Sequence, residues 1–357
     1  MRRSLTPLAR AAVAAVARPP LIGAGPVPGM RLATTRVTAE HRPRPRGKAA
    51  KAAQELAAAD CSPLVDLTAG VPADAAPYAA VKHWVVFSDL HVCDRTLDAS
   101  LAALRAVRAE VKARGPHAGA LFLGDWWHAR GSLPVRPLNA VLEELSMWTH
   151  PTLMLVGNHD LAGAGGADHA LAPLAAALPT CHVFDSPSLF LGALWLPYRR
   201  DAGELAAAAA AAASSPSPPS AVFAHADVVG AVANDAFQSA AGVDPCLFPA
   251  ATWLGHYHKP HAVKTKKGQP PVRYVGSPYQ VSAGEAGQDK ALVVLKGAVG
   301  KGGKGDAGRH SWAEVAAVPL AVGPRHHALA GAAPSPPSDL RPGDRVRWTV
   351  PAGIAPA

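Results

Sequence analysis

The sequence has 357 residues, 49% of them hydrophobic and 17% charged, which is typical of a globular protein that can bury a large core. Its net charge of +9 does not indicate nucleic-acid binding, because residues 1–60 alone carry +8 and the remainder carries only +1. No apolar run approaches the roughly 18 residues that span a bilayer, and the 4 cysteines form no CxxC pair that would indicate a thiolate metal site.

The first 60 residues have the composition of a targeting segment. They contain no acidic residue before Glu40, are rich in Arg, Ala and Ser/Thr, and can form an amphipathic helix over Leu5–Arg18. They lack the continuous apolar core of a secretory signal. We therefore expect residues 1–60 to be a disordered basic leader that acts as a transit peptide for the mitochondrion or the chloroplast. The alternative is a basic tail on a cytoplasmic protein.

From residue 83 onward, the patterns of strands and helices alternate. Short apolar runs bounded by turn residues predict strands, and apolar residues at helical spacing predict helices. In chain order, the expected elements are a strand at His83–Ser88, a helix at Leu97–Val111, a strand at Ala118–Leu123, a helix at Leu138–Leu145 and a strand at Thr152–Val156. This order predicts a doubly wound α/β sheet with right-handed crossovers.

The second half of the chain is richer in expected strands. They lie at His182–Asp185, Ala193–Leu196, Ala221–Ala224, Thr252–Leu254, Val272–Val275 and Ala291–Leu295. Few helical stretches separate them, apart from the end of a surface helix at Ala206–Ala213, so we expect a second sheet packed on the first. The Gly/Lys-rich segment Lys296–Gly308 predicts a hairpin excursion that does not pack. It is not expected to be a phosphate-binding loop, because it lacks the GxxxxGK[ST] pattern and no expected helix follows it. The domain should span residues 83–322, and residues 323–357 should be a C-terminal extension with one more strand at Leu340–Val350.

Side chains that can bind metals follow five of the expected strands. They are Asp89 and His91, Asp125, Asn158 and His159, His225, and His256 and His258. In α/β sheets, ligands bind at the carboxyl ends of the strands, and residues two apart in an extended segment point the same way. Asp, Asn and His without thiolates suit two divalent ions, for which we expect Mn²⁺, with Fe²⁺ or Zn²⁺ as alternatives. Asp125 is expected to bridge the two ions.

Two such ions favour phosphoester hydrolysis. They lower the pKa of a bridging water, so that hydroxide is available near neutral pH, and they neutralise the phosphoryl oxygens. A protonated imidazole beside the ligands can then give its proton to the leaving oxygen, and His159 is placed for this role. Each motif alone is common, and a histidine such as His225 is more often a hydrogen-bonded core residue. The five motifs in this order, each after an expected strand, indicate one site.

Together the motifs resemble the five signature blocks of the calcineurin-like metallophosphoesterase superfamily. The blocks are Ser88-Asp89-Leu90-His91, Gly124-Asp125, Gly157-Asn158-His159-Asp160, His225 and Gly255-His256-Tyr257-His258. The resemblance covers about residues 83–296 and implies a four-layer α/β/β/α metallophosphoesterase sandwich. It implies that one ion binds Asp89, His91, Asp125 and His258, that the other binds Asp125, Asn158, His225 and His256, and that His159 is the catalytic acid.

Two further segments resemble the SbcD-type DNA exonuclease branch and its phage-encoded relatives. They are Gly124–Gly131 and Tyr274–Gln280, the latter followed by Gly284-Glu285. This resemblance implies a nuclease-like phosphodiesterase acting on DNA or RNA, with His128 and Arg130 as candidate contacts to a substrate phosphate. SbcD-type nucleases continue into a DNA-binding cap and a segment that docks on a coiled-coil ATPase. The C-terminal extension, residues 323–357, resembles the start of such a cap, truncated because the chain stops at Ala357. A coiled-coil ATPase partner therefore has little support from the sequence.

Two other functions remain open. The same metal centre serves many phosphoesters, so the protein could be a phosphatase or cyclic-nucleotide phosphodiesterase with a small substrate. It could also be a non-catalytic scaffold that uses the same fold to bind partner proteins. A scaffold would be expected to lack some of the seven metal ligands, and all seven are present. We expect no membrane partner.

Overall fold

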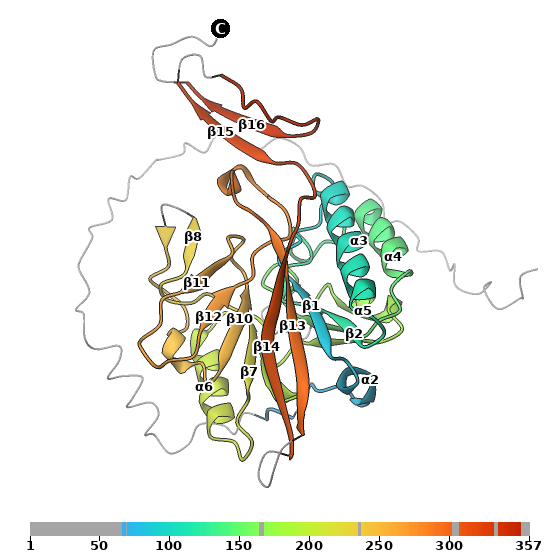
Figure 1. The fold of residues 1–357 in the computed structure, drawn as a ribbon, viewed down its shortest axis with the longest axis vertical. Coiled ribbons are helices and arrows are strands. Elements are labelled where there is room, and N and C mark those ends of the chain that lie inside the picture. Colours follow the sequence, from blue (N-terminus) through green and yellow to red (C-terminus); the bar gives the residue numbers. More distant parts are fainter. Residues whose placement is uncertain are drawn as a thin grey trace, which may run out of the picture. The chain divides into compact units, whose positions relative to one another are not determined.

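A computed structural model of the chain describes residues 66–350, apart from 69, 164–167, 235–236, 302–306 and 332–334. The predicted leader, residues 1–60, lies outside the described residues. In the part of the chain that is described, no helix is both long and apolar enough to cross a membrane. Two six-stranded sheets and two short two-stranded sheets make up the β-structure of these residues (Figure 1).

The first six-stranded sheet has the order β14-β13-β1-β2-β3-β4. Its strands are β1 (His83–Phe87), β2 (Ala118–Phe122), β3 (Thr152–Leu155), β4 (Cys181–Phe184), β13 (Ala291–Lys301) and β14 (Ala307–Pro319). Strands β1 to β4 are parallel, whereas β13 runs antiparallel to β1, and β14 antiparallel to β13. The carboxyl ends of β1, β2 and β3 therefore meet at one edge of the sheet. The three strands predicted for this sheet are confirmed. Two strands expected in the second sheet, His182–Asp185 and Ala291–Leu295, instead belong to the first: β4 pairs with β3, and β13 pairs with β1. Strands β13 and β14 form a longer hairpin than the one predicted at Lys296–Gly308.

Helices cover one face of this sheet. They are α3 (Leu97–Ala113), α4 (Val135–Leu145) and α5 (Ala172–Ala177), and the single turn α2 (Ala76–Ala79) precedes β1. Helix α3 buries Leu104, Val107 and Val111, which recur at the spacing of one helix face. The two predicted helices are confirmed. The short helix α5 was not predicted, because its alanine-rich sequence has no apolar stripe.

The second six-stranded sheet has the order β11-β12-β10-β7-β6-β5. Its strands are β5 (Ser188–Phe190), β6 (Ala193–Leu196), β7 (Ala221–His225), β10 (Ala251–Gly255), β11 (His261–Val263) and β12 (Val272–Tyr274). The four inner strands are parallel, and the two edge strands are antiparallel to their neighbours. Helix α6 (Ala202–Ala213) begins at Asp201, whose carboxylate accepts a hydrogen bond from the amide of Gly203 at 2.8 Å.

Alternation of side chains along the inner strands builds three separate cores. In β1, Val85 and Phe87 pack with the helices α3 and α4. Trp84 and Val86 point the other way and pack between the two sheets. Strands β6 and β7 alternate in the same manner between the inter-sheet core and the core under α6. The predicted α/β/β/α sandwich is therefore confirmed, because four layers enclose these three cores.

Two small sheets complete the described structure. Strands β8 (Val232–Asn234) and β9 (Phe237–Gln238) pair antiparallel, and β15 (His326–Ala330) and β16 (Arg345–Thr349) pair parallel. Strand β16 lies within the strand predicted at Leu340–Val350. Strand β15 was not predicted, because its histidines give no apolar alternation. The amide of His326 donates to Oε1 of Gln280 at 2.6 Å, which places the start of β15 beside the loop after β12.

Candidate metal centre

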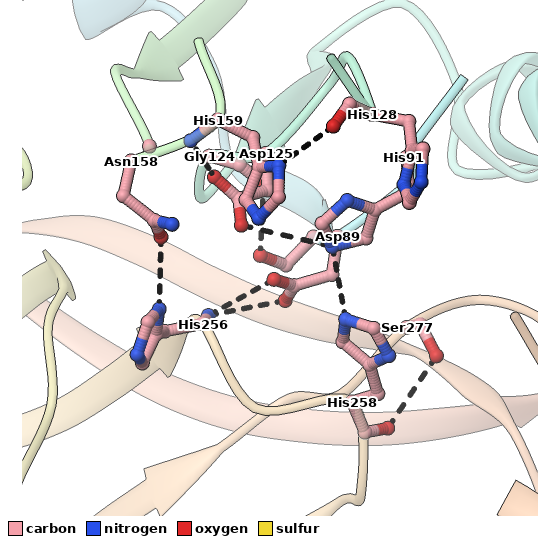
Figure 2. A network of polar contacts seen from close by, with 12 residues as sticks. Asp89, His91, Gly124, Asp125, His128, Asn158, His159, His256, His258 and Ser277 are labelled. Carbon is pink, nitrogen blue, oxygen red and sulfur yellow. Dashed lines mark hydrogen bonds and ion pairs between the residues drawn. The ribbon is translucent and has the colours of Figure 1, made fainter. Parts of the chain in front are cut away.

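The predicted metal ligands all lie at the carboxyl ends of strands. In the first sheet they follow β1 (Asp89 and His91), β2 (Asp125) and β3 (Asn158, with His159), and in the second they end or follow β7 (His225) and β10 (His256 and His258). The side chains are buried or half-buried. Figure 2 shows the labelled members of this set converging from both sheets on one space.

The loops that carry these residues have unusual backbone angles. Asp89, His91, Asp125 and His256 have φ values of 55°, 47°, 63° and 106°. Such angles cost a residue other than glycine about 1–3 kcal/mol and persist only where the surrounding structure enforces them. Four of them at one set of strand ends indicate that the loops are shaped to aim these side chains.

Two glycines allow the loops to approach one another. A Cβ atom on Gly124, whose φ is +98°, would lie 2.3 Å from Nδ1 of His225. A Cβ atom on Gly255 would lie 2.2 Å from Oγ of Ser88 and 2.3 Å from the carbonyl oxygen of Leu123. Glycine is therefore required at both positions for the two sheets to bring their strand ends together.

Three overlapping groups of side chains could hold a metal ion. In each group, the potential ligand atoms lie within 4.8 Å of one another. The groups are Asp89, His91 and His258; His91, Asp125 and His159; and Asp125, His225 and His256. The first and third fall within the two ligand sets that the family resemblance implies. Asp125 lies 3.6 Å from Nε2 of His91 through one carboxylate oxygen and 3.4 Å from Nε2 of His225 through the other.

The contacts of His225 favour a bound cation. Its Nδ1 lies 2.6 Å from the carbonyl oxygen of Leu123, which can only accept, so Nδ1 carries a proton. In the neutral imidazole, Nε2 then presents a lone pair to Oδ1 of Asn158 at 3.0 Å and to the carboxylate of Asp125. Lone pairs that face one another repel unless a proton or a metal ion lies between them.

A similar arrangement occurs on the other side of Asp125. Oε1 of Glu285 accepts a hydrogen bond from Nδ1 of His258 at 2.9 Å, which leaves the Nε2 lone pair of the neutral ring facing Nε2 of His91 at 2.9 Å. Nδ1 of His91 is buried and has no hydrogen-bond partner among the described residues. Nitrogen and oxygen donors arranged in this way fit borderline divalent ions.

The protonation states of the site agree with this arrangement. Burial lowers the pKa of His91 and that of His256 to about 3, so both rings are neutral and can bind a metal. Burial acts to raise the pKa of Asp125 and to lower that of His225, but their mutual attraction outweighs it. The pKa of Asp125 is consequently lowered, and that of His225 is raised to about 9. In the metal-free protein a proton on His225 offsets the charge of Asp125, and a metal ion would displace it.

Asp89 joins the two sheets. Both of its carboxylate oxygens accept from the backbone amide of His256, at 3.1 and 3.2 Å (Figure 2). The side chain is fully buried, and burial raises its pKa. A metal ion beside this carboxylate would favour its charged form.

His159 is held so that one ring nitrogen remains available. Its backbone amide donates to Oδ1 of Asp125 at 2.8 Å. Its Nδ1 donates to the carbonyl oxygen of His128 at 2.8 Å, which leaves Nε2 for a substrate or a proton. The ring packs edge to face on His91 at 4.8 Å between centroids. This geometry is compatible with a proton donor beside the metal ligands.

Asp160, which the sequence analysis did not single out as a site residue, supports the loops from below. It is fully buried, and its carboxylate accepts from four backbone amides, those of Gly157, Asp125, Trp126 and Trp127, at 2.8 to 3.2 Å. Burial, followed by the charge of Asp125, raises its pKa to about 7. Asp160 thus fixes the backbone that carries Asp125 and Asn158. The sequence feature that could have identified Asp160 is its position directly after Asn158 and His159.

A second buried group supports His258. Besides His258, Glu285 binds Nζ of Lys290 at 2.7 Å and Oγ of Ser277 at 3.0 Å. Lys290 also donates to the carbonyl oxygen of His258 at 2.8 Å. Burial acts to raise the pKa of Glu285, but the hydrogen bond from His258 and the charge of Lys290 lower it to about 2. In the sequence, Glu285 contributes only to the family resemblance, because no local pattern indicates that it contacts His258.

The two predicted substrate contacts lie in different places. His128 lines the cavity of the metal centre, together with His91 and His159. Arg130 is exposed and lines a neighbouring cavity with Arg199 and Arg200. The two cavities share Asn158 in their walls.

Comparison with known proteins agrees with this site. The family described as calcineurin-like phosphoesterase matches residues 83–210. The match includes the predicted metal ligands Asp89, His91, Asp125 and Asn158, the predicted acid His159, and the predicted substrate contacts His128 and Arg130. The structure adds His225, His256 and His258 from the strands that follow. No curated protein matches the sequence. Residues 83–210 therefore match a calcineurin-like phosphoesterase domain, and that family implies a metal-dependent hydrolase of phosphoesters.

Proposed function

We propose that the protein is a two-metal phosphoesterase that hydrolyses phosphodiester bonds and acts as a nuclease. The observation that carries this proposal is the position of Asp125, whose two oxygens face separate groups of imidazoles. When bound, two divalent ions lower the pKa of a water molecule and neutralise charge on the phosphoryl oxygens. Mn²⁺ is our first expectation, with Fe²⁺ or Zn²⁺ as alternatives.

Each ion would be held by side chains from both sheets. The first would bind Asp89, His91, Asp125 and His258, and the second would bind Asp125, Asn158, His225 and His256. The convergence of seven donors without a thiolate supports this assignment. It also argues against the scaffold alternative, because a scaffold has no need to preserve a buried set of facing lone pairs.

His159 would act as the general acid. Its Nδ1 is fixed by the carbonyl oxygen of His128, so Nε2 can hold the proton that the leaving oxygen receives. His128 would contact the substrate in the same cavity. Arg130 lies outside that cavity and would act on substrate only along the neighbouring cavity.

A nucleic-acid substrate, DNA or RNA, is favoured by the resemblance of Gly124–Gly131 and Tyr274–Gln280 to the SbcD-type branch. Basic side chains also flank the metal centre in both cavities. A small phosphoester substrate is the alternative. The transit-peptide role of the leader, the organelle and a coiled-coil ATPase partner remain predictions that the described residues do not test.

The proposal is tested with metal-reconstituted protein. The protein is stripped with a chelator, reloaded with Mn²⁺, Fe²⁺ or Zn²⁺, and assayed on single-stranded DNA, duplex ends, RNA, bis-p-nitrophenyl phosphate and a phosphomonoester. We expect metal-dependent cleavage of phosphodiesters, with the nucleic acids preferred. Cleavage of the monoester alone would favour the phosphatase alternative, and no metal-dependent cleavage would overturn the proposal.

A further inference from the structure

We propose that Arg95, His326 and Arg345 form a subsite for a second phosphate group of the substrate, beside the phosphodiester that is cleaved. This inference rests on the proposed function and deepens it. It assigns the substrate class as an ester that carries another phosphate one nucleotide away, as in a polynucleotide strand. The subsite joins the loop after β1 to the C-terminal strands β15 and β16.

The three residues line the same cavity as the metal centre. This cavity has a volume of about 420 Å³, and its walls include Asp125, His159 and His258 as well as the three proposed residues. Arg345, the first residue of β16, donates through Nη2 to the carbonyl oxygen of Arg95 at 3.4 Å. The contact holds the start of β16 beside the loop after β1. A site of this volume accommodates a nucleotide-sized ligand rather than a duplex.

The positive charges of the two arginines are not neutralised by protein carboxylates. Among the described residues, neither Arg95 nor Arg345 forms an ion pair, and both side chains are exposed. Their acidic neighbours in sequence are engaged elsewhere: Asp94 lies 3.5 Å from Arg136, and Asp344 lies 2.6 Å from Arg325. Of the described residues that line the cavity, Asp125 is the one with a carboxylate, and it faces the metal ligands. An anion in the cavity would therefore meet two uncompensated guanidinium groups.

His326 supplies the second, independent indication of a ligand. His326 lines this cavity as well as a neighbouring one and is only 6% exposed, yet its Nε2 is buried without a hydrogen-bond partner among the described residues. Buried polar atoms in folded proteins are nearly always paired, so an atom of this kind points to a ligand group or an ordered water. Burial, followed by the charge of Arg345, lowers the pKa of His326. The neutral ring can then donate one hydrogen bond to a phosphate oxygen beside the two arginines.

A pair of chromogenic substrates tests the subsite. One is the p-nitrophenyl ester of thymidine 5′-phosphate, and the other is the same ester with an added 3′-phosphate. The regioisomers, with the two phosphates exchanged, test which strand polarity the site accepts. The uridine analogues test whether it prefers ribose or deoxyribose. The leaving group is the same throughout, so only the second phosphate differs. We expect the added phosphate to raise kcat/KM about tenfold in one regioisomer, as one charge-assisted hydrogen bond would.

Variants assign this gain to the proposed residues. Arg345→Ala and Arg95→Ala should each reduce the tenfold gain to about threefold or less, chiefly through KM. The His326→Gln variant should lower the gain from the second phosphate by a larger factor than it lowers kcat/KM for the singly phosphorylated ester. Lys82→Ala removes an exposed positive charge beside the amino end of β1, and it should leave the gain unchanged. Isothermal titration calorimetry with thymidine 3′,5′-bisphosphate should give a weaker affinity for the arginine variants than for the wild type, and an unchanged affinity for Lys82→Ala.

The outcomes distinguish the subsite from the proposed function. Hydrolysis of every ester at the same kcat/KM would overturn the subsite and leave the phosphodiesterase in place. A gain that survives in the double variant Arg95→Ala/Arg345→Ala would assign the second phosphate to other residues and would also overturn it. Failure to hydrolyse any ester with any of the three metals would overturn the proposed function, and the subsite with it.

Discussion

Two buried carboxylates support the metal centre from opposite sides, and they do so by different means. In the part of the chain that is described, the carboxylate of Asp160, beneath the loops of the first sheet, accepts only from backbone amides. Glu285, beneath the loop of the second sheet, binds the side chains of His258, Ser277 and Lys290. Their pKa values move in opposite directions, to about 7 for Asp160 and to about 2 for Glu285.

The difference indicates a division of labour. Asp160 fixes the shape of a backbone that would otherwise avoid the positive φ of Asp125. Glu285 fixes the orientation and tautomer of one imidazole, as carboxylates commonly do for metal-binding histidines. Loss of the first should therefore affect folding and both ions, whereas loss of the second should affect mainly one ion.

The largest effect is expected from Asp125, which lies between the two supports. Asp125→Asn should lower kcat by about 10³-fold or more and weaken retention of both ions, because the shared charge is lost. The measurements are steady-state hydrolysis of bis-p-nitrophenyl phosphate and metal analysis after desalting. Asp98→Asn, at an exposed position in the first turn of α3, is the matched control. Full activity in Asp125→Asn would contradict the metal-centre assignment.

His159 belongs to neither support and should separate chemistry from metal binding. His159→Ala should keep its metal but lose about 10²- to 10⁴-fold in turnover, most severely on esters with poor leaving groups, because these need a proton. A series of esters with graded leaving-group pKa measures this. An equal loss across the series would argue against a proton donor.

Asp160→Asn should destabilise the protein and weaken both ions together. The amide group of asparagine has one accepting oxygen, so two of the four amide donors lose their partner, at about 1–3 kcal/mol for each buried group. Thermal unfolding with and without Mn²⁺, combined with metal analysis, is the measurement. An unchanged melting temperature would show that the four contacts do not support the loops.

Glu285→Gln should lower the affinity for one ion about 10- to 100-fold, because the orienting charge on His258 is lost. The same change leaves Lys290 buried without its carboxylate, which destabilises the fold. The double variant Glu285→Gln/Lys290→Met should regain stability but not metal affinity. Recovery of both in the double variant would mean that Glu285 acts only on folding.

The smallest effect should appear in the pH dependence of the metal-free protein. The pKa of Glu285 is lowered by folding, so its contribution to stability is present above the pKa of the unfolded chain, near 4.5, and is lost as the pH falls toward about 2. The free energy of unfolding, measured with denaturant in EDTA, should therefore fall more steeply between pH 5 and pH 3 for the wild type than for Glu285→Gln. Parallel curves would contradict the ion pair.

Local sequence predicted the parts of the fold that depend on local pattern. The strands that precede Asp89, Asp125 and Asn158 were predicted from short apolar runs, and their polar successors were predicted as candidates for one site. The roles of Asp160 and Glu285 as supports were not predicted. Glu285, for example, lies 27 residues after His258 in the chain, and only the fold brings the two side chains into contact. The same holds for Arg345, which reaches Arg95 across 250 residues. Strand β15 has no apolar alternation from which to predict it.

The central claim is that two ions share Asp125, and electron paramagnetic resonance of Mn²⁺-loaded protein tests it most directly. At saturation we predict two Mn²⁺ per chain and the broadened spectrum of an exchange-coupled pair, which Asp125→Asn should convert to the six-line signal of isolated ions. One ion per chain, or two ions that give an uncoupled spectrum in the wild type, would contradict the account.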